Sequence, residues 1–521
     1  MRKLMALLAV GTALLACSQF PLGQATVTPV LDPDPATHAP TATRTPRPLP
    51  TLAMTPAALE DEDQRAAMLE AFVEDVALLD AATAYSIQAR VVFEGRTSQA
   101  EIEGVARIVY RHPGPDMLED LVVMLWPNND QYRASMTAGP AAIGGAVVQG
   151  EPLGGGLAMR YSLPAPLAAG DSVDVSVPFR VVAEGPIGGS TPHRFGITEG
   201  VLFAPTFYPL VPLRLDGAWQ VADAPPGGDT TTSAVAGYRV ELTVPDDLAL
   251  VATGTEITRQ PVEDGQVAVT YVSGPVRDFA FALGSLVMEE TTSNGVAIRV
   301  WVLPQHEFEF DKVLQAARIQ VGLLTELVGP YPYTELDIVD VPGAYGGIEY
   351  PSLVTVGTLG GSWVIEPVVH EVAHQWFYGL VGDDQIAEPW LDEAFATYAT
   401  ALYYERSIGT GRYTGYLSDH RDALRTHPQP DMPIGRGVGE YGGREYGLFV
   451  YLKGSLFYDA LRQELGDDVF FDFLRSFFQE YRYLIASSAD FERSAEATCG
   501  CQLDDLFDLW VFEGGPVPGL E

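Results

Sequence analysis

The hydrophobic periodicity of the chain changes near residue 305, and this change limits the folds that it can adopt. Between residues 85 and 304, short alternating segments such as 86–93 and 102–110 are separated by clusters of Gly and Pro. Many short strands with this punctuation predict a β-sandwich-like domain. Residues 305–521 carry mainly helical spacing. We therefore predict an α+β chain, in which a β-sandwich-like N-terminal domain is followed by a mainly helical domain.

The first 17 residues have the features of an export signal. Arg2 and Lys3 form a short basic start, and the apolar stretch that follows is too short to span a bilayer comfortably. The segment ends in Leu-Leu-Ala-Cys, which resembles the lipobox of bacterial lipoproteins, whose cysteine is acylated and becomes the new N-terminus. The alternative is an ordinary signal peptide with an incidental cysteine. We expect lipidation at Cys17, and therefore an extracytoplasmic protein that is lipid-anchored to a bacterial membrane.

Two segments join this signal to the first domain. Residues 18–57 are rich in Pro, Thr and Ala and lack apolar periodicity, which predicts a disordered tether. Residues 58–84 carry apolar residues at helical spacing among acidic ones, which predicts a short helix.

The cysteines bear on how the fold is stabilised, and the net charge bears on which partners it can bind. Besides Cys17 the chain has only Cys499 and Cys501, and a bond between these two would close a very small, strained ring. We therefore expect no disulfide framework and a stability that comes from the hydrophobic cores. The net charge of −38 would repel phosphate backbones, so a nucleic-acid partner is not expected.

The clearest chemical pattern is His-Glu-Val-Ala-His, from His370 to His374. On a helix, two histidines at this spacing project from the same face and can share one Zn²⁺. Glu371 lies beside the first histidine and cannot bind the same metal in that geometry, but it can take a proton from a water at the metal. The alternative interpretation is a helix that carries two incidental histidines.

A third ligand favours the metal site. After a turn marked by Gly and Pro, a second helix brings Glu393 back towards the two histidines. Two His and one Glu leave a fourth position open for water or substrate, as a catalytic zinc site requires, whereas a structural zinc has four protein ligands. Asp392 is the competing carboxylate, but it points about a quarter-turn away on the helix. We predict that His370, His374 and Glu393 hold one Zn²⁺ per chain.

These residues resemble the aminopeptidase N family of gluzincin zinc metallopeptidases, which also includes leukotriene hydrolase. The family has its glutamate ligand at the spacing found here, and Trp-Leu-Asp-Glu-Ala-Phe-Ala at 390–396 is similar to its Trp-Leu-Asn-Glu-Gly-Phe-Ala segment. Gly-Gly-Ile-Glu-Tyr at 346–350 is similar to its Gly-Ala-Met-Glu-Asn motif, and Tyr-Leu-Lys-Gly at 451–454 resembles Tyr-x-Lys-Gly. The resemblance covers roughly residues 85–521 and implies that the helical region is a thermolysin-like catalytic domain.

The resemblance also implies roles for two further residues. Glu349 would pair with the free α-amino group of a peptide, which makes an exopeptidase. Tyr451 would donate a hydrogen bond to the oxyanion of the tetrahedral intermediate. Without the flanking motifs, Glu349 would be interpreted as a solvated turn residue and Tyr451 as a core aromatic.

Several positions depart from the family pattern. Ile348, Tyr350 and Ala394 replace the family's Met, Asn and Gly, which affects substrate preference rather than the zinc chemistry. The family usually takes a second amine-binding residue from its N-terminal domain, and Glu199 is a weak candidate for it. We expect the large C-terminal helical domain of the longer members to be absent.

We therefore expect a zinc-dependent aminopeptidase that removes N-terminal residues from peptides outside the cell membrane. Its partners would be peptides with a free N-terminus and, through Cys17, a membrane. A zinc endopeptidase of the same fold is the nearest alternative. A catalytically idle surface binding protein is the other, and the intact set of site residues argues against it.

Overall fold

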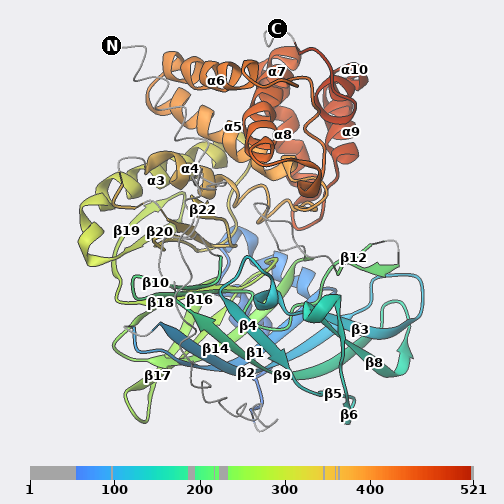
Figure 1. Ribbon diagram of the computed structural model, residues 1–521, viewed down its shortest axis with the longest axis vertical. Coiled ribbons are helices and arrows are strands. Elements are labelled where there is room, and N and C mark those ends of the chain that lie inside the picture. The colour runs from blue at the N-terminus through green and yellow to red at the C-terminus, as the bar shows by residue number, and fades with distance from the viewer. Residues whose placement is uncertain are drawn as a thin grey trace, which may run out of the picture.

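The computed structural model describes the chain from residue 54 to residue 517. The description omits residues 96–97, 186–193, 216, 222–232, 344–345, 358 and 362–363. The expected signal peptide, Cys17 and most of the expected tether therefore lie outside the described residues. Within the part that is described, no helix has both the length and the apolar character needed to cross a membrane. Figure 1 shows a β-rich domain below, a helical domain above and a small sheet between them.

The largest sheet of the N-terminal domain has nine strands in the order β16-β17-β14-β1-β2-β9-β5-β6, and β4 pairs with β9 beside this path. Its strands are β1 (Thr83–Val92), β2 (Gln99–Arg111), β4 (Ala134–Ala138), β5 (Ala141–Ile143), β6 (Ala146–Val148), β9 (Ser172–Glu184), β14 (Ala236–Pro245), β16 (Thr255–Val262) and β17 (Gln266–Val272). β1 runs parallel to β14, whereas its other neighbour, β2, is antiparallel. Side chains along β2 alternate between buried and more exposed positions, because one face of the sheet packs on the core.

Shorter sheets pack against this one. They comprise β10 (Gly196–Thr198), β11 (Val201–Pro205), β18 (Ala280–Gly284) and β15 (Ala249–Ala252); β3 (Leu118–Met124), β8 (Ala158–Leu167) and β7 (Glu151–Leu153); and β12 (Arg214–Leu215) with β13 (Ala218–Trp219). An aromatic cluster joins the layers. Tyr85 of β1 stacks on Tyr238 of β14 at 4.9 Å, and Tyr208, which follows β11, meets both rings edge-on. The domain begins with α2 (Asp61–Arg65) and the 3-10 helix η1 (Glu70–Asp80).

The C-terminal half begins with a five-stranded sheet in the order β19-β20-β21-β23-β22. Its strands are β19 (Val287–Ser293), β20 (Val296–Val302), β21 (Glu335–Asp340), β22 (Gly347–Ile348) and β23 (Leu353–Val356). β20, β21 and β23 are parallel, and β22 is an antiparallel edge strand. The 3-10 helix η4 (Pro304–Glu309) and helix α3 (Phe310–Leu327) form the crossover from β20 to β21, as parallel strands require.

Helices follow the sheet and form the upper part of the molecule (Figure 1). They are α4 (Ile365–Ala373), α5 (Trp390–Ser407), α6 (Thr410–Arg425), α7 (Gly454–Leu465), α8 (Asp467–Tyr481), α9 (Ser488–Cys499) and α10 (Asp504–Phe507), with π-helical turns η6 (Gly447–Lys453) and η7 (Asp508–Phe512). Every residue of α5 from Trp390 to Tyr404 is buried, so this helix is the centre of the layer. The predicted α+β class, with a β-rich N-terminal and a mainly helical C-terminal domain, is confirmed.

Two local expectations are wrong. The helix predicted to carry His370 and His374 ends at Ala373, one residue before the second histidine, because the chain turns back: Gly379 donates its N–H to the carbonyl of His374, and Tyr378 takes a φ of 101°. Cys499 and Cys501 also form a disulfide, although the small ring between them argued against one. The intervening Gly500 takes the left-handed conformation that ends α9.

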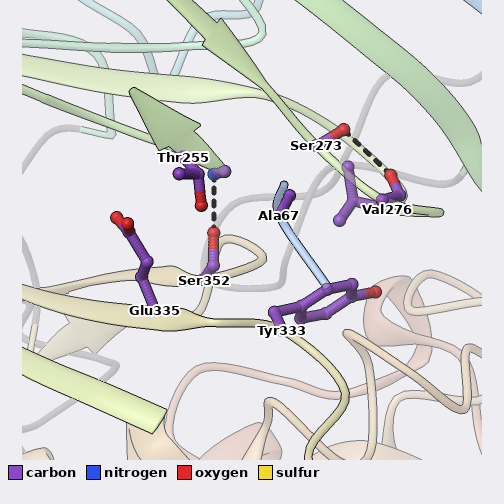
Figure 2. A pocket seen from close by; sticks show the side chains of 9 residues that line it. Ala67, Thr255, Ser273, Val276, Tyr333, Glu335 and Ser352 are labelled. Atoms are coloured by element: carbon purple, nitrogen blue, oxygen red, sulfur yellow. Dashed lines mark hydrogen bonds between the residues drawn. The ribbon is translucent and has the colours of Figure 1, made fainter. Parts of the chain in front are cut away.

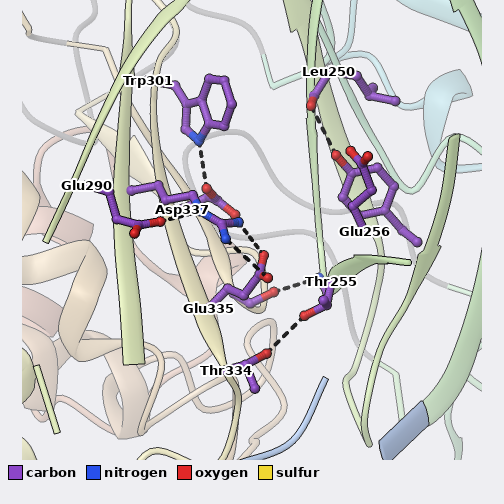
Figure 3. A network of polar contacts seen from close by, with 12 residues as sticks. Leu250, Thr255, Glu256, Glu290, Trp301, Thr334, Glu335 and Asp337 are labelled. Carbon is purple, nitrogen blue, oxygen red and sulfur yellow. Dashed lines mark hydrogen bonds and ion pairs between the residues drawn. The ribbon is translucent and has the colours of Figure 1, made fainter. Parts of the chain in front are cut away.

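The β-rich domain contacts the five-stranded sheet through the turn before β16. Gly254 donates its N–H to the Ser352 hydroxyl at 2.8 Å, and the hydroxyls of Thr255 and Thr334 lie 3.0 Å apart. Figure 2 shows Thr255 and Ser352 at a small pocket between the domains, which Ala67, Tyr333 and Glu335 also line. Figure 3 shows the polar contacts beside it, including those of Glu335 and Asp337 on β21. Arg299 of β20 pairs with Glu335 at 2.5 Å. These contacts place β21 and β23 against the first domain.

Candidate metal centre

Three donor atoms from two helices converge on one point. The Nε2 atoms of His370 and His374 lie 3.1 Å apart, and Oε2 of Glu393 lies 3.0 Å from the first and 3.2 Å from the second. Ligand atoms of a tetrahedral zinc, bound at about 2.0–2.1 Å, are about 3.3 Å from one another. The three side chains therefore have the composition and the spacing of a zinc site with one position open.

The two helices are held together so that these side chains meet. His370 and His374 lie one turn apart at the end of α4, and Glu393 lies in the first turn of α5. Phe377, just after α4, stacks on Phe395 of α5 with ring centroids 3.9 Å apart. Nδ1 of His374 lies 3.2 Å from the carbonyl of Phe377, which orients the ring so that Nε2 faces Glu393.

The donor set is buried, and its hydrogen bonds lower the pKa of Glu393. His374 is 1% exposed and Glu393 is 3% exposed. Burial alone would raise the pKa of Glu393, but hydrogen bonds from His370 and His374 outweigh it and hold that pKa well below its usual range. Glu393 is therefore a carboxylate, which is the form that binds a metal.

Glu371 lies on the side of the histidines that faces β22. Its carboxylate, that of Glu349 and a ring nitrogen of His374 all lie within 4.8 Å of one another. A Cβ atom at Gly347 of β22 would lie only 2.4–2.5 Å from the side chain of Glu371. Only glycine therefore lets the edge strand pass this close to Glu371, which explains why the residue before Ile348 has no side chain.

The turn after β22 carries Glu349 and is fixed by the residue that follows the second histidine. Gln375 donates from Nε2 to the carbonyl of Tyr350 at 3.2 Å and accepts from the N–H of Ser352 at 2.8 Å. Because Gln375 is adjacent to His374, these bonds tie Glu349 to the metal ligands. Glu349 is 4% exposed, so it is not the solvated turn residue that its sequence position alone would suggest.

Tyr451 lies in the π-helical turn η6, and its hydroxyl donates to Oε1 of Glu393. Its ring stacks on that of His370, with centroids 5.8 Å apart and an interplanar angle of 17°. Single π-helical turns are frequent at functional sites because they redirect one side chain. The hydroxyl of Tyr451 therefore lies at the metal ligands rather than in an apolar core.

The Lys-Gly pair after Tyr451 holds η6 in place. Lys453 is buried and donates its ammonium to the carbonyls of Pro430 and Met432 at 3.0 and 2.6 Å. Burial lowers the pKa of Lys453 to about 8. A Cβ atom at Gly454 would lie 2.4 Å from Cβ of Ala394, so this glycine lets α7 cross α5 closely.

The structure leaves Glu199 outside the site and adds Gln385 to it. Glu199 lies 3.4 Å from Gln305 and is not brought to Glu349 by any contact within the described residues. Asp392 turns to Gln385, whose amide also contacts Glu349. No sequence pattern pointed to Gln385, because its place depends on contacts with two other elements, the turn at Glu349 and helix α5.

Comparisons with known proteins agree with this geometry. Residues 325–510 match the Peptidase family M1 domain. Aminopeptidase 2 of Candida albicans is 25% identical over 56% of this chain and 34% of its own length. Human aminopeptidase B is 29% identical over 41% of this chain and 34% of its own length. The chain thus spans about a third of the length of these curated relatives.

Solved structures share the fold over both domains. The M1 zinc metallopeptidase of Deinococcus radiodurans, solved as a variant, has a TM-score of 0.64 at 18% identity, over 84% of this chain and 96% of that one. A structure of that enzyme bound to a Tyr-Ser-Ala substrate gives a TM-score of 0.63 at 19% identity, with the same coverage. The match over residues 325–510 agrees with the family that the motifs indicated, and the three donor atoms have the composition and spacing that the indicated zinc requires.

Proposed function

We propose that the protein is a zinc-dependent aminopeptidase that hydrolyses the N-terminal peptide bond of peptides. One observation carries the proposal. The buried carboxylate of Glu349 lies with Glu371 and His374 in a single cluster, beside the three-donor set. A metal centre with an adjacent buried carboxylate can bind a peptide by its carbonyl and its α-ammonium together.

His370, His374 and Glu393 would hold the zinc. Bound there, zinc supplies Lewis acidity, which polarises a carbonyl and lowers the pKa of a water. Glu371 accepts a proton from the attacking water as the water oxygen bonds to the scissile carbon. Glu371 then gives that proton to the amide nitrogen as the C–N bond breaks, so the amine leaves neutral. The Tyr451 hydroxyl donates to the developing oxyanion.

Glu349 makes the reaction specific for chain ends. An ammonium buried beside the metal without a partner would cost several kcal/mol, and the carboxylate of Glu349 removes that cost. A blocked or internal peptide brings no positive charge and leaves the buried carboxylate of Glu349 without a counter-ion. Free N-termini are therefore favoured and blocked ones rejected.

The test compares aminoacyl substrates with their N-acetylated forms. The wild type is expected to cleave only the free amines. Glu349→Ala is expected to raise KM and lower kcat for the free amine while zinc content stays normal. If blocked and free peptides are cleaved equally well, the protein is an endopeptidase, and if neither is cleaved it is a binding protein.

The proposal includes a location outside the cell membrane. Its support is the sequence of the first 17 residues, which ends at Cys17. Cys17→Ser is expected to move the protein from the detergent phase to soluble or unprocessed forms. Unchanged partitioning into the detergent phase would show that Cys17 carries no anchor.

A further inference from the structure

The side-chain amide of Gln385 lies between two buried carboxylates. Its Nε2 atom is 2.9 Å from Oε1 of Glu349 and 2.9 Å from Oδ2 of Asp392. Gln385 is 2% exposed, Glu349 is 4% exposed and Asp392 is 1% exposed. An amide NH2 group has two hydrogens, so it can donate one to each carboxylate.

Asp392 is itself held in place. Its other oxygen, Oδ1, accepts from the N–H of Glu393 at 2.6 Å, in the first turn of α5. Gln385 therefore connects the helix that carries a metal ligand to the turn that carries Glu349. Residues between α4 and α5 thereby set the position of Glu349 relative to the metal ligands.

The chemistry of this position favours an amide. If the amide were flipped, its carbonyl oxygen would face two carboxylates and repel both, so the orientation of Gln385 is determined. An apolar side chain would leave two buried carboxylates facing each other without a donor. A carboxylate would add a third negative group to the pair.

We propose that Gln385 is a positioning residue for substrate recognition, which orients Glu349 towards the α-ammonium of the peptide. This inference rests on the proposed aminopeptidase function. Gln385 does not touch the reacting atoms. It acts by donating one hydrogen bond to Glu349 and a second to Asp392, whose position is set by α5.

The experiment measures amine recognition by two inhibitors that differ in one group. Leucine hydroxamate has an α-amino group, and the matching acyl hydroxamate lacks it. Both chelate a metal, so the ratio of their inhibition constants reports the contribution of the amine alone. The variant is Gln385→Met, which keeps the length of the side chain and removes its donor. The control is Gln320→Met on α3, where a buried glutamine amide makes no hydrogen bond within the described residues.

Gln385→Met is expected to reduce the amine preference at least about tenfold, the loss that follows removal of one charge-assisted hydrogen bond. Inhibition by the acyl hydroxamate and zinc content should stay at the wild-type level, as they should for both inhibitors in Gln320→Met. In a Glu349→Ala background, Gln385→Met should change the preference no further, because the two residues act as one unit.

The outcomes separate this inference from the function on which it rests. If the wild type shows no amine preference, the proposed aminopeptidase function fails. If the wild type prefers the amine and Gln385→Met retains that preference, the inference about Gln385 is wrong and the function stands. A parallel loss of zinc and of acyl hydroxamate inhibition would assign Gln385 a purely structural role and would also overturn the inference.

Discussion

Arg277, in the β-rich domain, donates from Nε to the backbone carbonyl of Tyr378 at 2.6 Å, in the turn that follows α4. Its Nη2 atom donates to the carbonyl of Leu484 at 2.5 Å and to that of Leu380 at 3.3 Å. The neighbouring Asp278 accepts a hydrogen bond from the Tyr378 hydroxyl. Arg277 is 2% exposed, so a buried cation of the first domain fixes the backbone that follows His374.

Replacing Arg277 with methionine is expected to lower the free energy of unfolding by about 3–5 kcal/mol, because the hydrogen bonds of its buried guanidinium to the carbonyls of Tyr378, Ser233, Leu380 and Leu484 are lost. Urea unfolding would measure the change. Arg107→Met is the matched control, since Arg107 pairs with Asp174 at 2.6 Å on the surface. Its effect should stay below about 1 kcal/mol. Equal effects of the two substitutions would show that the buried contacts of Arg277 contribute no more than a surface ion pair.

The metal ligands and the general base are expected to respond differently to substitution. His370→Ala, His374→Ala and Glu393→Ala should each remove most of the bound zinc, because each deletes a donor. Glu371→Gln should retain zinc and lose activity, because the ligands remain and the proton acceptor is gone. Metal analysis of the purified variants, with peptide hydrolysis measured in parallel, checks both. Loss of zinc from Glu371→Gln would contradict the role given to that residue.

Tyr451→Phe tests the oxyanion donor. The substitution removes the hydroxyl and keeps the ring that stacks on His370. We expect kcat to fall by about 10²–10³-fold with little change in KM, because the hydrogen bond forms only in the transition state. Zinc content is measured as well, since the hydroxyl also contacts Glu393. A kcat near that of the wild type would leave Tyr451 a structural aromatic.

Local sequence patterns were sufficient to predict those parts of the site whose position depends only on local helix geometry. The spacing of His370 and His374 places both side chains on one helical face in any structure, and the next helix needed only a turn of the right length to return Glu393. The change of periodicity near residue 305 likewise indicated a β-rich part followed by a helical part, because strands and helices bury side chains with different periods. It did not indicate that β19 and β20, which precede it, pair with β21 in the sheet of the C-terminal half.

Contacts between distant segments could not be predicted in this way. The end of α4 at Ala373 depends on Arg277, which lies about a hundred positions earlier and holds the carbonyl of Tyr378. Gln385 gave no signal, because its partners belong to two other elements. The Cys499–Cys501 bond contradicted an argument from ring size that ignored the left-handed turn at Gly500.

Asp337 of β21 gives a prediction about stability and pH. It is 3% exposed and accepts a hydrogen bond from Nε1 of Trp301 at 2.6 Å (Figure 3). Burial raises its pKa from 3.8 to about 7, although Arg299 on β20 opposes the rise. The other charged groups that act on it are Glu335 on its own strand and Glu290 on β19, and both add to the rise.

The sign of the effect follows from the direction of this pKa shift. The folded state binds the proton more tightly than the unfolded state, so the resulting stability is complete below about pH 4. It declines as the pH rises towards 7 and is absent above that value.

Asp337→Asn keeps an acceptor for Trp301 and does not titrate. The free energy of unfolding of the wild type should therefore fall relative to that of Asp337→Asn by on the order of 2 kcal/mol between pH 5 and pH 8. Asp278, whose pKa burial also raises to about 7, titrates in both proteins and cancels in the comparison. Urea unfolding of both proteins across this range measures the difference, and a constant difference would mean that Asp337 keeps an ordinary pKa in the folded protein.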